Sequence, residues 1–287
     1  MSFGSLKRLP VRAMGRVAPD ALRFLAHHNR IGRGRWPMLE VLISDPKCRN
    51  WLASLENPTR TRHKFTIFTM PGDLTSDWIK LHGQHEVGIE AFILSHLRPG
   101  AAFLDVGANI GYFSLLAAVV GKSPVFAFEP QASVAELLER SVEHNGIGDR
   151  VRVVRGALSD SSSTMRMTAC PGNSGHSRIV TPGAADAQTY NVPVVAFDDW
   201  YRENPIGPVC ACKIDTEGAD YRVLRGMGEL LERDRPAVVV EVIDEHLREY
   251  ASAAADLLEL MRKAGYTEVT RRYWVLGDQN RYFERPR

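Results

Sequence analysis

Residues 103–111, Phe-Leu-Asp-Val-Gly-Ala-Asn-Ile-Gly, form an apolar run that reaches an acid and then a glycine-containing turn. Glycine is expected in this turn because a Cβ would obstruct a ligand that approaches the backbone. The run is not the dinucleotide fingerprint Gly-x-Gly-x-x-Gly, because Asn109 and Tyr112 replace its second and third glycines. The carboxylate of Asp105 would repel a pyrophosphate and attract a positively charged ligand. S-adenosylmethionine, with its sulfonium and ammonium groups, is such a ligand.

A second acid, Glu129, ends the apolar run 126–130, which has the sequence Phe-Ala-Phe-Glu-Pro. A carboxylate at the end of a second strand can accept hydrogen bonds from both hydroxyls of a ribose. Dinucleotide-binding folds share this feature, so it indicates a nucleoside ligand only in combination with the first motif.

A third group of polar residues lies at the end of the apolar run 208–215. Lys213, Asp215 and Glu217 alternate there, and a strand would point all three the same way. Alternatively, these acids could be purely structural, because negative side chains stabilise the positive end of the dipole of a following helix. Glu241 stands within a run of valines, where a carboxylate is costly unless it is paired or functional. These carboxylates are therefore candidates for removing a proton or positioning a substrate.

The elements that must position these residues alternate between apolar strands and amphipathic helices. Strands are predicted at 101–106, 125–129, 151–158, 208–215 and 237–242, with helices between them at 110–120, 134–145, 223–231 and 254–265. A strand at 64–70 and helices ending at residues 82 and 97 precede this series, and a hairpin at 267–285 follows it. Such alternation predicts a doubly wound α/β fold whose parallel sheet binds ligands at the carboxyl ends of its strands.

Taken together, these segments resemble the FkbM family of S-adenosylmethionine-dependent methyltransferases. Over residues 80–285 the resemblance also includes Ala157-Leu158-Ser159-Asp160, a Gly/Asn/Ser loop at 172–177 and an acidic turn at 197–200. Thr216 and Asp220 depart from the family, in which valine and glutamate are commoner. The resemblance implies a class I methyltransferase fold, which is Rossmann-like with a mostly parallel seven-stranded sheet and a C-terminal hairpin. The expected organisation is a basic, mainly helical extension at 1–80 and a methyltransferase domain at 81–287.

The resemblance implies an enzyme of biosynthesis that methylates a hydroxyl of a small molecule, sugar or glycan, with S-adenosylmethionine as cofactor. The hydroxyl must lose its proton during transfer, and His246 is one candidate base. The expected catalytic residues are Asp215, Glu217, Glu241 and His176. Glu86 could meet the ammonium of the cofactor or could simply cap a helix. The expected cofactor-binding residues are Glu86, Asp105, Gly107, Asn109, Gly111, Glu129, Pro130, Ala157, Leu158 and Asp215.

Other interpretations remain at this stage. An RNA-directed methyltransferase is one, but the Lys–Asp–Lys–Glu tetrad of RNA ribose methyltransferases is incomplete, since no lysine lies between Lys213 and Lys263. DNA is not an expected partner, because the turn after Asp215 lacks the prolines of DNA base methyltransferases. A non-catalytic S-adenosylmethionine-binding protein is another interpretation, although all the glycines and acids of the motifs are present. No metal site is expected, with an oxygen-rich magnesium site at Asp215, Glu217 and Glu241 as the alternative.

The charge of the chain is unevenly distributed. Of 287 residues with a net charge of +2, residues 1–64 hold 13 Lys+Arg against 4 Asp+Glu, and the rest hold 23 against 30. This basic segment predicts either peripheral contact with a membrane or other anionic partner, or a solvated helical cap. The four cysteines form no Cys-x-x-Cys pair and no signal peptide is recognised, so we expect a cytoplasmic protein with reduced thiols. Homo-oligomerisation is left open.

Overall fold

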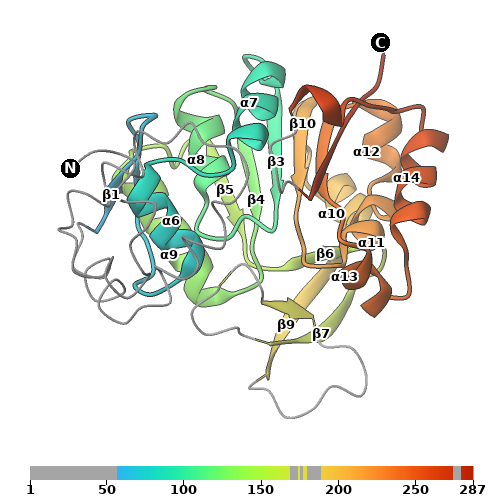
Figure 1. Cartoon of the computed structure of the whole chain (residues 1–287), viewed down its shortest axis with the longest axis horizontal. Helices are drawn as coiled ribbons and strands as arrows, with labels where there is room; N and C mark the ends of the chain where they lie inside the picture. The colour runs from blue at the N-terminus through green and yellow to red at the C-terminus, as the bar shows by residue number, and fades with distance from the viewer. Residues whose placement is uncertain (1–56, 169–173, 175–176, 180–188, 274–278, 287) are drawn as a thin grey trace, which may run out of the picture.

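The computed structural model describes residues 57–168, 174, 177–179, 189–273 and 279–286. Its main feature is a seven-stranded sheet in the order β12-β13-β11-β10-β3-β4-β5 (Figure 1). The strands run parallel except β13, which is antiparallel to both of its neighbours. Their bounds are β3 Ala102–Val106, β4 Val125–Phe128, β5 Val151–Val154, β10 Val209–Ile214, β11 Ala237–Glu241, β12 Thr267–Glu268 and β13 Asn280–Glu284.

Two hydrophobic cores cover the two faces of this sheet, because side chains alternate along each strand. In β3, Phe103 faces one core, and Leu104 and Val106 face the other. The first core is completed by α6 Leu74–His82, α7 Val87–His96, α8 Tyr112–Val119 and α9 Ala132–His144. The second is completed by α10 Phe197–Glu203, α11 Asp220–Arg225, α12 Gly228–Arg233, α13 Asp244–Glu249 and α14 Ala254–Lys263.

The predicted doubly wound α/β fold is therefore confirmed. From β3 the chain builds outward through β4 and β5, then returns to place β10 and β11 on the other side of β3. This reversal between β3 and β10 is the topological switch point, where parallel sheets bind ligands. In the register of these strands Asp105 lies opposite Lys213, and Val106 lies opposite Ile214. The C-terminal hairpin predicted at 267–285 is present as β12 and β13.

Two predicted elements are each divided in the structure. The strand expected at 151–158 ends at β5, and after a turn at Gly156 the chain enters β6, Ala157–Ser159, in a different sheet. The helix expected at 223–231 is split into α11 and α12. The break falls at Gly226, where a Cβ would lie 2.2 Å from the carbonyl oxygen of Ser159, so close packing on β6 replaces a continuous helix.

The second sheet has four strands in the order β6-β9-β7-β8 and projects from one end of the main sheet (Figure 1). Its strands are β6, β7 Ser163–Thr168, β8 Arg178–Ile179 and β9 Thr189–Ala196. β7 pairs with β9 in antiparallel fashion over six residues of each strand. The small sheet is inserted between β5 and β10, so the chain passes through it at the switch point.

Part of the predicted N-terminal extension packs onto the methyltransferase domain. The strand expected at 64–70 is reduced to β2, Thr66–Ile67, paired with β1, Thr59–Arg60. The Thr66 N–H donates to the Asn145 side chain at the end of α9, over 2.9 Å. Asp73 caps α6 by accepting from the Ser76 N–H, as its position predicts. The short helices expected before residue 57 lie outside the described residues, and the boundary at residue 80 stays a prediction.

No helix among the residues that the structure describes is long and apolar enough to cross a membrane.

Candidate active site

One pocket, of about 250 Å³, opens at the carboxyl ends of β3, β4 and β10. Its wall comprises segments 106–110, 128–130, 156–158 and 215–217, with further residues from α6, α8, the small sheet and the segment just before α7. The predicted site residues on this wall are Glu86, Gly107, Asn109, Glu129, Pro130, Ala157, Leu158, Asp215, Glu217 and Glu241. Segments far apart in the sequence thus meet at the predicted edge of the sheet.

Two predicted site residues that the structure describes, Gly111 and Asp105, are not on this wall. Gly111 packs away from it: a Cβ there would lie 2.0 Å from Leu138 Cδ1 in α9. Asp105 is fully buried behind the wall. His176 lies outside the described residues, although Ser174 and Ser177 of the same loop line the pocket.

The structure adds a second reason for glycine in the first turn. Gly107 has φ +74°, and a Cβ there would lie 1.8 Å from the carbonyl oxygen of Asp215. The glycine is therefore required by the close approach of the turn after β10 as well as by its own backbone conformation. The Gly107 and Ala108 N–H groups both donate to the Phe128 carbonyl over 3.0 Å, which ties the turn to β4.

Asp105 organises the floor of the pocket from below. Ser114 Oγ in α8 donates to Asp105 Oδ2 over 2.6 Å, and Lys213 Nζ lies 3.9 Å from Asp105 Oδ1. Burial raises the pKa of Asp105, while the charge of Lys213 and the hydroxyl of Ser114 oppose the rise. Asp105 therefore contacts Ser114 and Lys213 behind the wall, and its direct contact with the cofactor stays a prediction.

Lys213 is the buried cation of the site. Its ammonium donates to the Gly107 carbonyl over 3.0 Å and lies 3.1 Å from Asp215 Oδ2. Burial alone would lower the pKa of Lys213, but the carboxylates of Asp215 and Asp105 outweigh it and hold the pKa above its ordinary value. The side chain therefore stays protonated and fixes the position of the Asp215 carboxylate.

Glu129 lines the pocket at the carboxyl end of β4. Its two carboxylate oxygens accept from the Asn109 N–H over 2.9 Å and from the Gln131 N–H over 2.8 Å. Burial raises the pKa of Glu129 to about 7, and these two backbone donors only partly oppose the rise. Each oxygen keeps a further lone pair, so the carboxylate can still accept from ribose hydroxyls.

Glu86 and His85 form the side of the pocket next to α7. Glu86 occupies the N-cap position of α7, yet its side chain makes no capping hydrogen bond, which disfavours the purely structural role. Asn280 Nδ2 donates to Glu86 Oε1 over 3.4 Å. His85 packs against the rings of Tyr112 and Phe113. Burial lowers the pKa of His85 to about 4, and the charge of Lys213 adds to this effect.

The acids after β10 separate into two groups. Asp215 contacts Lys213, but Glu217 turns away with φ +54° and places Oε2 3.4 Å from Nδ1 of His246. The expectation that one strand would point all three side chains together therefore holds only for Lys213 and Asp215. Glu241, the last residue of β11, lies close to Glu217 and His246. Burial raises the pKa of Glu241, and the charge of Asp215 raises it further.

Asp220 determines the shape of the turn that carries Glu217. Its Oδ1 accepts from the N–H and the hydroxyl of Thr216, and its Oδ2 accepts from the Gly218 N–H. Sequence analysis noted Asp220 only as a departure from the family. Asp220 comes two residues after Gly218. An acid at this distance from a glycine in a turn is a sequence signal that could have predicted its hydrogen bonds to the turn.

A contact between distant segments links the small sheet to the pocket, and no local pattern could have revealed it. The Ser174 N–H donates to Asp73 Oδ1 over 2.6 Å, across 101 positions of sequence. Ser174 Oγ also donates to Asn109 Oδ1 over 3.1 Å. Ser174, which belongs to the Gly/Asn/Ser segment noted in the sequence, therefore contacts the turn after β3.

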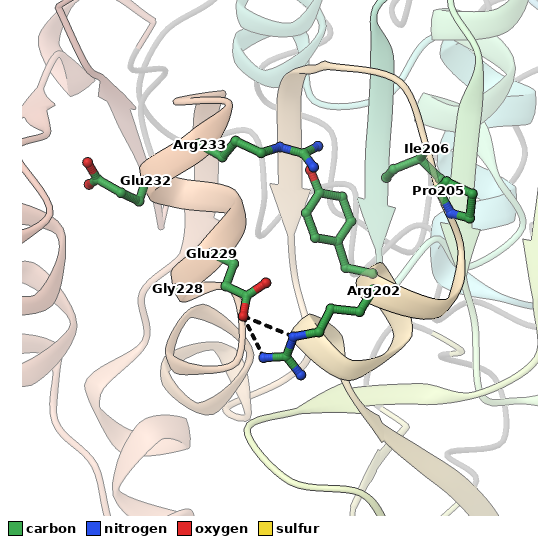
Figure 2. Close-up of a pocket in the computed structure, with 8 residues that line it drawn as sticks. Arg202, Pro205, Ile206, Gly228, Glu229, Glu232 and Arg233 are labelled. Carbon is green, nitrogen blue, oxygen red and sulfur yellow. Dashed lines mark hydrogen bonds and ion pairs between the residues drawn. The ribbon is translucent and has the colours of Figure 1, made fainter.

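A larger hollow, of about 660 Å³, lies apart from this edge, between α10 and α12 (Figure 2). Its charged side chains are paired: Arg202 Nε donates to Glu229 over 3.0 Å, and the Arg233 guanidinium lies 4.4 Å from the Tyr201 ring centroid. It holds none of the predicted site residues, so the smaller pocket is the candidate active site.

The residues of the smaller pocket fit S-adenosylmethionine. Carboxylates stand at both ends, with Glu129 where a ribose would donate hydrogen bonds and Glu86 where an ammonium would be attracted. The strand order and the position of the pocket define a class I methyltransferase that uses S-adenosylmethionine. Residues 105–268 match the model of the methyltransferase FkbM domain, and the chain belongs to this family.

Relatives of known sequence support this assignment. The chain is 30% identical over 203 residues to the 31-O-demethyl-FK506 methyltransferase FkbM of Streptomyces tacrolimicus, covering 60% of this chain and 75% of that protein. It is 27% identical over 165 residues to the methyltransferase sdnD of Sordaria araneosa, covering 47% and 64% of the two chains. The AMB antimetabolite synthetase AmbE of Pseudomonas aeruginosa is 28% identical over 223 residues, which span 65% of this chain and 10% of AmbE.

Solved structures give more distant similarities. The methyltransferase FkbM of Methylobacillus flagellatus KT has 15% identity and a TM-score of 0.43, over 82% of this chain and 57% of that one. The Streptococcus mutans protein SMU.1697c has 13% identity and a TM-score of 0.45, over 71% and 99% of the two chains.

Proposed function

We propose that this methyltransferase transfers the methyl group of S-adenosylmethionine to a hydroxyl of a small molecule, sugar or glycan in a biosynthetic reaction. The observation that carries the proposal is the group of carboxylates Asp215, Glu217 and Glu241 on the pocket wall, at the ends of β10 and β11. A hydroxyl is a poor nucleophile until its proton is removed, and carboxylates beside the methyl donor can accept that proton. The name of the Streptomyces tacrolimicus relative, which specifies a 31-O position, also favours an oxygen acceptor.

S-adenosylmethionine supplies an electrophilic methyl group on a sulfonium. Glu129 would accept from the ribose hydroxyls, and Glu86 would attract the ammonium. The turn at Gly107 and Asn109 holds its shape through hydrogen bonds to β4, so the binding surface is preorganised. Holding the acceptor oxygen in line with the methyl carbon supplies much of the rate enhancement.

The proton of the acceptor hydroxyl would pass to Asp215 or Glu217 as the new carbon–oxygen bond forms and the carbon–sulfur bond breaks. Lys213 lies 3.1 Å from Asp215 and keeps its carboxylate oriented. Glu217 is oriented by His246 instead. Burial and the charge of Asp215 raise the pKa of Glu241, so Glu241 releases a proton less readily than an exposed carboxyl and is less suited to the role of base.

The charge of the pocket also bears on the RNA-directed alternative. Within the described residues the wall holds the carboxylates of Glu86, Glu129, Asp215, Glu217 and Glu241, against a single lysine. That lysine is Lys213, and it is already paired with Asp215. A polyanion would be repelled from such a mouth, so a neutral or cationic acceptor is favoured. A non-catalytic binding protein would have no need of the acids at the ends of β10 and β11.

The proposal is tested with labelled S-adenosylmethionine and a panel of hydroxyl compounds, carboxylic acids, amines and short RNAs. Label transferred to a hydroxyl compound supports it, with nuclear magnetic resonance of the product locating the new methyl group on oxygen. Transfer only to nitrogen, carboxylate or RNA would contradict it. If S-adenosylhomocysteine fails to bind in calorimetry, the assignment of the cofactor pocket itself is wrong.

A cytoplasmic location and a peripheral contact of the basic residues 1–64 with anionic partners also remain proposals. The contact predicts association with anionic vesicles at low salt that is lost at high salt, because added salt screens exposed charges. A chain lacking residues 1–56 should lose this association and still bind S-adenosylhomocysteine. If the truncated and full chains associate equally with the vesicles, the basic segment does not bind anionic partners and the helical-cap interpretation is favoured. Homo-oligomerisation is measured on the same samples by light scattering.

A further inference from the structure

Three side chains from three separate segments converge near the ends of β10 and β11. Glu217 follows β10, Glu241 ends β11 and His246 lies in α13. Each offers a ligand atom that lies within 4.8 Å of the other two. The sequence pattern groups Asp215 with Glu217 and Glu241, but the structure brings His246 to these glutamates in place of Asp215.

The environment of Glu241 adds an independent observation. Its Oε2 atom is buried and has no hydrogen-bond donor among the residues that the structure describes. Lys213, the buried cation of the same pocket, is committed to Asp215 and to the Gly107 carbonyl. A buried carboxylate oxygen without a donor or counter-charge is costly. A bound cation would remove this cost and would also balance the charge of Glu217.

The distances and the donor types suit a metal ion. Glu217 Oε2 and His246 Nδ1 lie 3.4 Å apart. Two ligands that are each about 2.1 Å from one ion, at a near-tetrahedral angle, have this separation. An imidazole with two carboxylates is a donor set that suits Mn²⁺ and Zn²⁺ better than Mg²⁺, which prefers oxygen alone.

The backbone holds these ligands in place before any ion arrives. The turn that carries Glu217 is fixed by the hydrogen bonds from Thr216 and Gly218 to Asp220. Gly218 packs directly on α13, where a Cβ would lie 2.6 Å from the carbonyl oxygen of His246. The turn and α13 are thus in contact through their backbones, which limits the movement of Glu217 relative to His246.

We propose that Glu217, Glu241 and His246 bind one divalent cation, Mn²⁺ or Zn²⁺, on the acceptor side of the pocket. This inference rests on the proposed function and deepens it. With three protein ligands the ion keeps open positions, which the acceptor hydroxyl and a neighbouring oxygen of the same molecule would fill. The acceptors would therefore be compounds with two adjacent oxygens, such as vicinal diols or hydroxycarbonyls.

In this arrangement a bound cation would polarise the acceptor hydroxyl, and Asp215 is the carboxylate that would be left to take its proton. The acceptor oxygen then forms a bond to the methyl carbon as the carbon–sulfur bond breaks, and the sulfur keeps the electron pair. No oxidant or further reactant is needed.

Metal binding is tested on the full chain by calorimetry with Mn²⁺ and Zn²⁺ after treatment with chelator. We expect one ion per chain, with affinity about 100-fold lower in Glu241→Gln and in His246→Gln. The matched control is Glu245→Gln, an exposed neighbour in α13, which should bind like the wild type. Electron spin-echo spectroscopy of the Mn²⁺ complex should show coupling to an imidazole nitrogen, lost in His246→Gln.

These measurements distinguish failure of the metal site from failure of the proposed function. S-adenosylhomocysteine binding, measured on the same samples, also shows whether each variant is folded. The metal site is refuted if neither ion binds the wild type at about 1 mM, if Glu241→Gln binds like the wild type, or if no nitrogen coupling is seen. If S-adenosylhomocysteine binds while the ions do not, only the metal site falls. If methyl transfer goes to a nitrogen acceptor while the ions bind, only the proposed function falls.

Discussion

The Asn109 N–H donates a 2.9 Å hydrogen bond to the Glu129 carboxylate, so the turn after β3 is joined to the end of β4 at the floor of the pocket. The same carboxylate is placed to accept from a ligand. It therefore serves both the local fold and the binding surface, and its ionisation should affect both. Burial raises the pKa of Glu129 to about 7, which brings this ionisation into the physiological range.

Binding of S-adenosylhomocysteine should consequently weaken as the pH falls below about 7. Ribose hydroxyls donate to the ionised form of Glu129, and below its raised pKa a growing fraction of the free protein holds a proton that binding must remove. The affinity should fall by up to about tenfold per pH unit in this range. Calorimetry between pH 5.5 and pH 8.5 on the wild type and on Glu129→Gln measures it, and the variant should be weaker but much less dependent on pH. If the affinity changes with pH in the same way in both proteins, the pH dependence belongs to a group other than Glu129.

Gly107→Ala should damage the binding turn. The residue has φ +74°, and its new Cβ would lie 1.8 Å from the carbonyl oxygen of Asp215, so the two turns must separate. We expect S-adenosylhomocysteine affinity to fall by about tenfold or more, the scale of one lost charged hydrogen bond. Gly148→Ala is the control, since nothing lies within 4 Å of a Cβ there, and it should bind normally. Normal binding by Gly107→Ala would mean that the turns tolerate separation.

Lys213→Met should destabilise the protein by about 3–5 kcal/mol, because it leaves the buried Asp105 and the neighbouring Asp215 without their cation. Urea unfolding measures the change. The control is Lys263→Met, whose exposed partner Glu259 lies 3.5 Å away, where a surface pair contributes only about 0–1 kcal/mol. The double variant Lys213→Met with Asp105→Asn should recover part of the loss. A loss below about 1 kcal/mol in the single variant would show that Asp105 is protonated or compensated in another way.

Asp215→Asn and Glu217→Gln should have different effects on catalysis. Both keep the shape of the side chain and remove its basicity. If Asp215 takes the proton, Asp215→Asn lowers kcat by about 10²–10⁴-fold while S-adenosylhomocysteine affinity changes little. Glu217→Gln should lower methyl transfer together with metal affinity, and added Mn²⁺ should restore part of its rate. A wild-type kcat in Asp215→Asn would move the role of base to Glu217.

His85 should make the stability depend on pH. Its pKa is lowered to about 4 in the folded protein, against about 6.5 when unfolded. Between these values the unfolded chain binds a proton that the folded chain does not, so stability falls as the pH decreases from about 6.5 to 4. The loss should reach roughly 2 kcal/mol after allowance for partial exposure of the ring. Chemical unfolding of the wild type and of His85→Gln across this range isolates the effect, since the buried carboxyls with raised pKa values contribute to both proteins alike. An unchanged difference between the two proteins across the range would contradict it.

Patterns local in the sequence predicted most of the fold. The alternation of apolar strands and amphipathic helices is a short-range property, and it indicated β3, β4, β10 and β11 because their side chains are buried on both faces. The acids at the strand ends were recognised for the same reason, since the carboxyl ends of parallel strands share one edge. Breaks such as the one at Gly226 were missed because they depend on a contact with Ser159, which is remote in the sequence.

The sequence by itself determined that Asp105, Glu129, Asp215 and Glu241 come at the ends of strands in a doubly wound fold. The tertiary structure alone decided what each one touches. Asp105 is withdrawn behind the wall with Lys213 and Ser114, whereas Glu217 turns toward His246, 29 positions further along the chain. Side-chain direction beyond the last residue of a strand depends on backbone torsions such as the φ of +54° at Glu217. Those torsions are set by the contacts of Asp220 and α13, which form only when distant segments pack together.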